Sequence, residues 1–181
     1  MTPLVRIVHL TGPAFHALAR GDLAAAEALS PVPLSDFLAG PECRGVWAFR
    51  ARQADEDPEC AGWVTGVIWD EQQSLAVGRA GFHAAPDAAG LVEIGYAVEA
   101  AHRRQGYARA ALEALLRRAA DDPLVKTVRV SIAPDNVASY SLAAHYGFVK
   151  VGEQWDEEDG REIVYEVPAD QFSRSRKASD R

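Results

Sequence analysis

The sequence predicts one α/β domain on a mixed, mostly antiparallel sheet of about six to seven strands, flanked by about four helices. Two observations carry this prediction. Between residues 63 and 98, segments with strand periodicity are separated only by short turns, which is typical of an antiparallel meander. In the second half of the chain, strand and helix patterns alternate. No repeat or change of composition marks a second domain, so residues 1–168 are expected to form the domain and residues 169–181 a polar tail that frays.

The N-terminal third predicts one strand and two helices. Residues 5–10 alternate loosely between apolar and polar side chains and indicate a first strand. Residues 11–29 are rich in Ala and Leu and predict a helix, with Pro13 near its start. Prolines between residues 31 and 41 break the chain, and a second helix is expected across residues 47–51.

The remaining elements follow from the same two periodicities. Three strands of the meander are expected first, and a helix then opens the alternating half of the chain. The expected strands are residues 63–69, 75–82, 91–98, 127–132, 148–153 and 161–167, and the expected helices are residues 106–120 and 136–146.

Composition excludes several classes of protein. Hydrophobic residues make up 48% of the chain and charged residues 25%, close to the average of soluble globular domains, so a disordered chain is disfavoured. No run approaches the ~18 apolar residues that a membrane span needs, and the first residues lack the layout of a secretion signal. The two cysteines, Cys43 and Cys60, exclude a disulfide framework, and no Cys or His spacing suggests a metal site. A cytoplasmic protein without a metal is therefore expected.

The charge balance narrows the range of partners. The chain carries 26 acidic and 19 basic residues, a formal net charge of −7. Such a chain is a poor candidate for binding nucleic acid, which usually requires a basic face. It is better suited to a cationic small molecule or a protein amine, although net charge also serves solubility alone.

The clearest chemistry lies where the strand over residues 91–98 leads into a loop and then a helix. N–H groups in the first turn of a helix have no partner within the helix, and the helix dipole adds positive charge there. Gly106 allows an anion to approach the backbone, and Arg103, Arg104 and Arg109 add positive charge. A single glycine beside solvated arginines also fits an ordinary loop, and the three-glycine pattern of a dinucleotide fold is absent.

Two residues of the preceding strand have alternative interpretations. Gly95 lies inside a strand pattern, which indicates either a packing glycine or a bulge whose backbone groups could bind an amide-bearing ligand. Glu93 stands in an otherwise apolar strand, so it is a candidate general base or a member of an ion pair with Arg79 or Arg129.

A second polar constellation begins the helix expected over residues 136–146. Asn136 and Ser139 lie on one side of its first turn, either facing a ligand or serving only as the helix cap. Gly147 is expected to end the helix in a left-handed conformation, with Phe148 as its hydrophobic follower.

These segments resemble a known family. Residues 103–108, Arg-Arg-Gln-Gly-Tyr-Ala, are similar to the pyrophosphate loop of the GNAT superfamily of acetyl-CoA-dependent N-acetyltransferases, whose pattern is Arg/Gln-x-x-Gly-x-Gly/Ala. Asn136-x-x-Ser139, followed by Gly147-Phe148, resembles the second signature of that family. Residues 93–96, Glu-Ile-Gly-Tyr, resemble the branch that includes the ribosomal-protein alanine N-acetyltransferases. The resemblance covers roughly residues 63–167.

The resemblance implies a GNAT-like fold and a cofactor site. It implies that the sheet splays between the strands over residues 91–98 and 127–132, and that acetyl-CoA, as co-substrate, lies there without a metal. The pyrophosphate is expected over the loop, the pantetheine at the main chain near Val98, and the cofactor tail beside the second helix start. The expected cofactor-binding residues are Val98, Arg103, Arg104, Gln105, Gly106, Tyr107, Ala108, Arg109, Asn136 and Ser139.

The implied reaction is direct attack of a primary amine on the thioester. Glu93 is the candidate base, because the amine must lose a proton. Many family members place a general-acid Tyr seven residues after the Asn, where this sequence has Ala143. Tyr140 is therefore the candidate acid, with Ser139, water or no acid as alternatives, since a thiolate leaves readily.

Two other functions remain open at this point, together with the identity of the acceptor. The missing Tyr leaves room for a catalytically silent acyl-CoA-binding sensor, and the helix start alone suits a phosphate or nucleotide binder. The expected acceptor is a small molecule or a protein N-terminus or lysine, with no nucleic acid or membrane as partner. Trp47 and Phe49 are expected to line the acceptor cleft, and the protein is expected to be a monomer or a homodimer.

Overall fold

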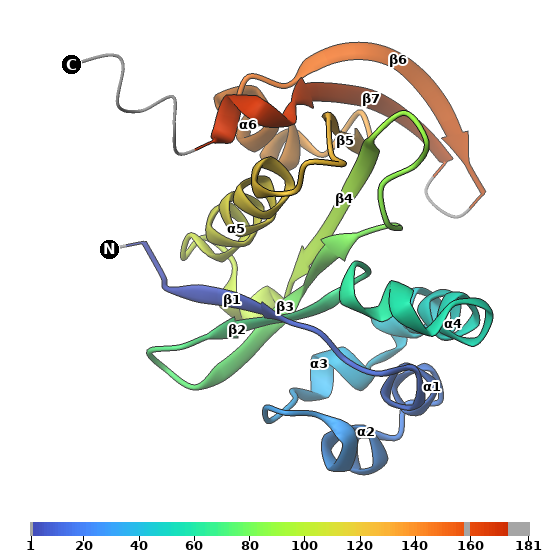
Figure 1. Cartoon of the computed structure of the whole chain (residues 1–181). Coiled ribbons are helices and arrows are strands. Elements are labelled where there is room, and N and C mark those ends of the chain that lie inside the picture. Colours follow the sequence, from blue (N-terminus) through green and yellow to red (C-terminus); the bar gives the residue numbers. More distant parts are fainter. Residues whose placement is uncertain (1, 158–159, 174–181) are drawn as a thin grey trace. The chain divides into compact units, whose positions relative to one another are not determined.

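The computed structural model describes residues 2–157 and 160–173 and has the predicted α/β architecture (Figure 1). Its seven described strands have the order β1-β2-β3-β4-β5-β7-β6. The β4–β5 pair is parallel, and the pairs β1–β2, β2–β3, β5–β7 and β6–β7 are antiparallel, so the mixed, mostly antiparallel sheet is confirmed.

The chain divides into two compact units, and β4 and α5 contribute residues to both. Unit 1 comprises Met1–Ala85 and Tyr96–Ala114, and unit 2 comprises Pro86–Gly95 and Leu115–Arg181. The expectation that residues 1–168 fold as a single domain stays a prediction.

Unit 1 contains the N-terminal helices and the first three strands. Its elements are β1 (Val5–Val8), α1 (Gly12–Ala19), α2 (Leu23–Leu29), α3 (Asp36–Ala39), α4 (Pro41–Glu56), the 3-10 turn η1 (Pro58–Gly62), β2 (Gly66–Asp70), β3 (Leu75–Phe82), the end of β4 (Leu91–Val98), the 3-10 turn η2 (Ala100–His102) and the start of α5 (Tyr107–Asp121).

The single helix predicted over residues 11–29 is wrong. The chain forms α1 and α2 instead, because Gly21 adopts a left-handed φ of 72° after α1. Asp22 then caps α2 by accepting a hydrogen bond from the N–H of Ala25 at 3.0 Å. The Ala- and Leu-rich pattern is continuous across the break, so only the capping geometry separates the two helices.

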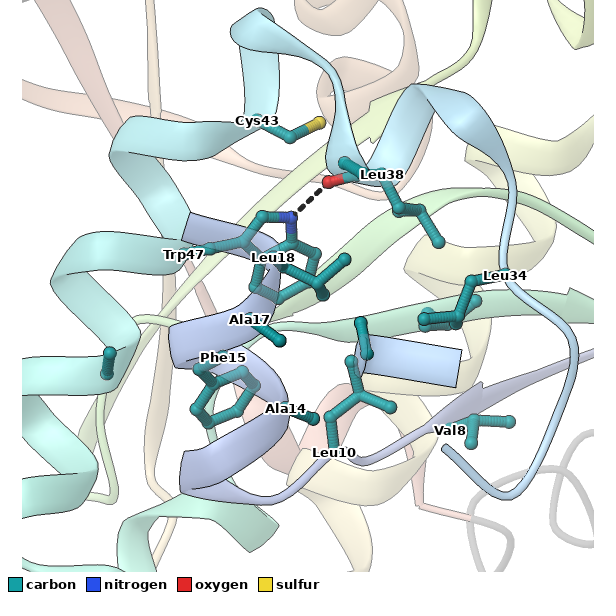
Figure 2. Close-up of a cluster of buried hydrophobic side chains, with 14 of the residues drawn as sticks. Val8, Leu10, Ala14, Phe15, Ala17, Leu18, Leu34, Leu38, Cys43 and Trp47 are labelled. Atoms are coloured by element: carbon teal, nitrogen blue, oxygen red, sulfur yellow. Dashed lines mark hydrogen bonds between the residues drawn. The ribbon is translucent and has the colours of Figure 1, made fainter. Parts of the chain in front are cut away.

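The core of unit 1 lies where α1, α3 and α4 meet the buried face of β2 (Figure 2). Trp47 of α4 is fully buried, stacks on Phe15 with ring centroids 5.8 Å apart, and donates its Nε1 hydrogen to the carbonyl of Leu38 at 2.7 Å. The expectation that Trp47 lines an acceptor cleft is therefore wrong, because packing places its ring in the core. Phe49, by contrast, is 47% exposed, with the guanidinium of Arg52 5.5 Å from its ring centroid.

Unit 2 contains the rest of the sheet and the C-terminal helices. Its elements are the first part of β4, the end of α5, β5 (Thr127–Ile132), α6 (Val137–His145), β6 (Val149–Asp156), β7 (Gly160–Pro168) and the 3-10 turn η3 (Ala169–Phe172). Ala169 is buried, and the remainder of the expected tail, residues 174–181, lies outside the described residues.

The central strand of unit 2 has one apolar and one polar face. In β5, Val128, Val130 and Ile132 are buried, and the alternating residues Arg129 and Ser131 are half-buried. β5 pairs with β7 over its whole length, whereas the register with β4 covers only Leu91–Glu93. The polar face of β5 therefore brings its side chains close to the first part of β4.

The helix α6 begins and ends as predicted. Asn136 caps it by accepting a hydrogen bond from the N–H of Ser139 at 3.1 Å. At its end, Gly147 has a φ of 79°, and the N–H of Phe148 donates to the carbonyl of Ala143 at 3.2 Å, which forms a Schellman motif. Phe148 is buried, as a hydrophobic follower requires.

Candidate active site

The loop before α5 contains two residues with positive φ, a feature that a cradle of backbone N–H groups for an anion can use. Arg104 has a φ of 64° and Gly106 a φ of 89°, so two left-handed residues alternate immediately before the helix. Such alternation turns successive N–H groups toward one concave side, where an anion can accept them. The carbonyl of Gly106 accepts the first turn's hydrogen bond from the N–H of Ala110 at 3.0 Å. A Cβ added to Gly106 would lie 3.2 Å from Cδ of Pro3, so this position is closely covered on that side.

The side chains of the loop divide into two kinds. Arg103 donates its Nε hydrogen to the carbonyl of Val98 at 3.1 Å, and Gln105 donates to the carbonyl of Ala101 at 3.1 Å. These two side chains therefore brace the loop itself. Arg104 is exposed beside Gly106, and its left-handed backbone is unusual for a residue with a Cβ.

The first turn of α5 carries one more of the expected residues. Arg109 is exposed and pairs along the helix with Glu113, with its Nε 3.2 Å from Oε1. Ala108, the residue after Tyr107, is half-buried, and its side chain is only a methyl group. A small residue there leaves the helix start open to a bulky anion.

Tyr107, one of the expected cofactor-binding residues, has a buried side chain that anchors the helix start. It is 2% exposed, and its hydroxyl donates to Oδ2 of Asp70 at 2.7 Å while accepting from Nε2 of Gln73 at 2.7 Å. Burial and the hydrogen bond to Asp70 raise the pKa of Tyr107 to about 12. The sequence gives a weak signal for this contact, because Asp70 simply ends an apolar strand.

Asp70 is the charged member of this network. It is 1% exposed, and its carboxylate also accepts hydrogen bonds from the N–H groups of Gln72 at 2.8 Å and Gln73 at 3.0 Å. Burial alone raises its pKa, but the hydrogen bonds from Tyr107, Gln73 and Gln72 outweigh it and hold the pKa below the ordinary value. The carboxylate therefore stays ionised in the interior.

In unit 2, Glu93 is half-buried on the polar face of the sheet. The hydroxyl of Ser131 donates to Oε1 of Glu93 at 2.6 Å, and Nε2 of Gln154 lies 3.2 Å from the Ser131 hydroxyl. Arg129, one of the two alternative ion-pair partners, binds Glu166 through Nε at 2.9 Å and a terminal nitrogen at 2.6 Å. Glu93 thus belongs to a hydrogen-bonded series of side chains that also includes Ser131 and Gln154.

The candidate acid and the second cofactor segment lie on α6. Tyr140 is 48% exposed, and its ring centroid lies 5.6 Å from that of Tyr165. Asn136 and Ser139 make the capping contact described above, which is the structural alternative that the sequence left open. Ala143 is buried, although it lies three residues after exposed Tyr140 on a neighbouring part of the helix surface.

Three further observations concern the described residues. Among residues 2–157 and 160–173, no group of three or more His, Cys, Asp or Glu side chains is arranged to hold a metal ion. No helix within these ranges is long and apolar enough to cross a bilayer. Cys43 and Cys60 are both free and buried.

The fold and the loop together define a class of protein. The structure has a mixed sheet and, between β4 and α5, a loop that leads directly into the helix. The sequence resemblance implies this arrangement for an acetyl-CoA-dependent acyltransferase. Residues 15–149 match the acetyltransferase (GNAT) domain, and the chain belongs to this family.

Two curated proteins are similar in sequence. The chain is 34% identical over 105 residues to L-2,4-diaminobutyric acid acetyltransferase of Streptomyces anulatus, covering 58% of this chain and 51% of the relative. It is 31% identical over 88 residues to the N-acetyltransferase YjdG of Bacillus subtilis strain 168, named as uncharacterized, covering 49% of this chain and 52% of the relative. The chain therefore spans about half the length of the curated relatives it matches.

Solved structures share the fold. A ribosomal-protein-S5-alanine acetyltransferase from Vibrio fischeri superposes with a TM-score of 0.59 at 16% identity, covering 93% of each chain. At this identity the likeness concerns the fold alone. This likeness agrees with the GNAT-like fold that the sequence resemblance implies.

Proposed function

We propose that this protein transfers an acetyl group from acetyl-CoA to a primary amine of a small molecule or a protein. The observation that carries the proposal is the pair of left-handed residues, Arg104 and Gly106, at the start of α5. Membership of the GNAT family supports it, as do the acetyltransferase names of both curated relatives.

The loop is proposed to bind the pyrophosphate of acetyl-CoA. The backbone N–H groups of Gly106, Tyr107 and Ala108 would donate to the pyrophosphate oxygens. They lie before the N–H of Ala110, which donates to the carbonyl of Gly106 in the first turn of α5, so the helix itself gives them no acceptor. Arg104 is the proposed charged contact, since its side chain is exposed beside the cradle. The other proposed contacts are Val98, Arg103, Gln105, Arg109, Asn136 and Ser139.

Glu93 is proposed to accept the proton of the acceptor amine. An amine with a pKa near 10.4 costs about 4–5 kcal/mol to deprotonate at neutral pH, so a positioned carboxylate lowers the barrier. The amine nitrogen then attacks the thioester carbonyl, the carbon–sulfur bond breaks, and the electron pair leaves on sulfur. Tyr140 or water returns a proton to the thiolate. Ser131 supports this role by orienting the Glu93 carboxylate through its 2.6 Å hydrogen bond.

The proposed acceptor is an amine that is cationic in water. The net charge of −7 favours such a molecule, and a curated relative is named for L-2,4-diaminobutyric acid, which carries amines. A cytoplasmic location and a monomeric or homodimeric state are part of the proposal. The two free buried cysteines support the location, because a reducing compartment keeps thiols unpaired.

Release of free thiol from acetyl-CoA in the presence of a panel of amines tests the proposal. The panel should include diamines, polyamines, amino acids and peptides with free N-termini or lysines. Acceptor-dependent release is expected. Tight binding of CoA without release for any amine would favour a silent sensor, and equal affinity for CoA and ADP would favour a nucleotide binder.

A further inference from the structure

We infer that buried Tyr107 and Asp70, joined by Gln73 of the exposed turn after β2, form a hydrogen-bonded lock that positions the α5 start for pyrophosphate. This inference rests on the proposed function of the loop. It assigns to three side chains, which need not touch the substrate, the task of holding the backbone that does.

The lock joins two segments that are distant in sequence. Tyr107 is the first residue of α5, directly after Gly106, and Asp70 is the last residue of β2. The Tyr107 hydroxyl and the Asp70 carboxylate lie 2.7 Å apart. Because the ring is rigid and 2% exposed, this contact fixes where α5 begins relative to the strand within unit 1.

Asp70 is itself held from a second side. Two backbone N–H groups of the turn after β2, those of Gln72 and Gln73, donate to Oδ1 of Asp70. The side-chain amide of Gln73 donates both to Oδ2 of Asp70 at 3.0 Å and to the Tyr107 hydroxyl at 2.7 Å. The carboxylate therefore cannot turn away without leaving several donors, the buried Tyr107 hydroxyl among them, without an acceptor.

The strand that carries Asp70 is also well supported. β2 pairs with β1 on one side and with β3 on the other, and all its residues are buried. On the other side of the tyrosine, His102 of η2 meets the Tyr107 ring edge-on, with centroids 6.2 Å apart. The aromatic ring is thus held between the sheet and the turn that precedes the loop.

This arrangement matters because the loop is strained. Arg104 is in a left-handed conformation that is unfavourable for a residue with a Cβ. Such a conformation persists only where its surroundings over-determine it. The lock supplies that constraint at the C-terminal end of the loop, and the Arg103 bond to the Val98 carbonyl supplies it at the other end.

Tyr107→Phe tests the lock because it keeps the buried ring and removes only the hydroxyl. Thr65→Val is the matched control, since Thr65 is 3% exposed in the same unit and loses one buried hydroxyl that accepts from Arg50 Nε. Both variants are expected to lose thermal stability. Only Tyr107→Phe is expected to weaken the binding of CoA. The Kd for CoA, measured by calorimetry, should rise about tenfold.

Kinetics separate positioning from general damage. For Tyr107→Phe we expect a raised KM for acetyl-CoA with an unchanged kcat at saturation. The kcat/KM for S-acetylpantetheine should also be unchanged, because that donor lacks the pyrophosphate. Asp70→Ala should resemble Tyr107→Phe, and the double variant should bind CoA no more weakly than either single variant.

The possible outcomes are distinguishable from failure of the proposed function. If Gly106→Trp abolishes CoA binding while Tyr107→Phe binds it as tightly as the natural protein, the lock is wrong and the loop assignment stands. If Thr65→Val weakens the binding of CoA as much as Tyr107→Phe does, the weaker binding results from a general loss of stability, and the lock is again wrong. If folded Gly106→Trp binds CoA normally, the loop assignment is wrong and the lock falls with it.

Discussion

The two units hold their candidate functional groups in opposite ways. In unit 1, the loop before α5 is tied to a network in which Tyr107 and Asp70 are buried and Gln73 joins them from the exposed turn. In unit 2, Glu93 is half-buried and Tyr140 is 48% exposed on its helix. A cradle of backbone N–H groups requires fixed geometry, whereas groups that exchange protons require access to substrate and water. The contrast predicts that variants of the loop and its network in unit 1 change affinity for CoA, and that variants of Glu93 and Tyr140 in unit 2 change rate.

The largest expected effect is on the cradle itself. Gly106→Trp should abolish CoA binding, with a loss of at least about a thousandfold in affinity, because a side chain at a φ of 89°, whose Cβ would lie 3.2 Å from Cδ of Pro3, forces the loop out of its present conformation. Isothermal titration of CoA into the folded variant measures this. Gly160→Trp is the control, since Gly160 also has a left-handed φ of 76° and a Cβ added there meets only Trp155 at 3.9 Å, and it should bind CoA normally.

The next effect concerns unit 2 and should appear in rate alone. Glu93→Gln is expected to lower kcat about a hundredfold or more, the usual contribution of a general base, with little change in the Kd for CoA. Thiol release under saturating acetyl-CoA measures it. Ser131→Ala removes the 2.6 Å hydrogen bond and keeps the carboxylate, so it should cost much less. A normal rate for Glu93→Gln would remove Glu93 as the base.

The lock predicts a dependence of stability on alkaline pH. Tyr107 has a pKa raised to about 12 against an ordinary value of 10.0. Its contribution to stability is therefore complete below pH 10.0 and is lost as pH rises toward about 12. Burial also raises the pKa of Cys43 and Cys60, so some alkaline loss is common to all variants, but chemical denaturation at a series of alkaline pH values should show a larger loss between pH 10.0 and about 12 in the natural protein and in Tyr140→Phe than in Tyr107→Phe. A similar alkaline loss in Tyr107→Phe would contradict the assignment.

The smallest effect separates strain from charge within the loop. Arg104→Gly removes the left-handed strain together with the guanidinium, so stability should rise or stay within about 1 kcal/mol while CoA affinity falls several-fold. Arg104→Ala removes the same charge but keeps a Cβ, and it should be the less stable variant by about 1 kcal/mol. Equal stability of these two variants would show that Arg104 is not strained.

Sequence periodicity identified the central strands well. The predicted residues 75–82, 91–98 and 127–132 coincide with β3, β4 and β5, because alternation and flanking turns are local signals. Both ends of α6 were predicted for the same reason, since a cap and a Schellman glycine act within a few residues. The split between α1 and α2 was missed, because an Ala-rich pattern suits either one helix or two.

The candidate site was predicted in its loop positions but not in what holds them. Arg103, Arg104 and Gly106 were identified from a local pattern of charge and glycine. The burial of Trp47, by contrast, depends on Phe15 and Leu38, which are distant in the chain. A single sequence carries no signal for such pairs, since each partner is ordinary in its own segment.

The sequence by itself determined the strand and helix pattern, the loop that opens α5 and membership of an acetyltransferase family. Only the tertiary structure decided that Tyr107 is an anchor, that Asp70 is the buried charge it meets, and that Ser131 orients Glu93. The reason is physical. Local patterns are set by neighbouring residues, whereas a buried hydrogen bond forms only once folding has brought together residues such as Asp70 and Tyr107, 37 positions apart, and removed them from water.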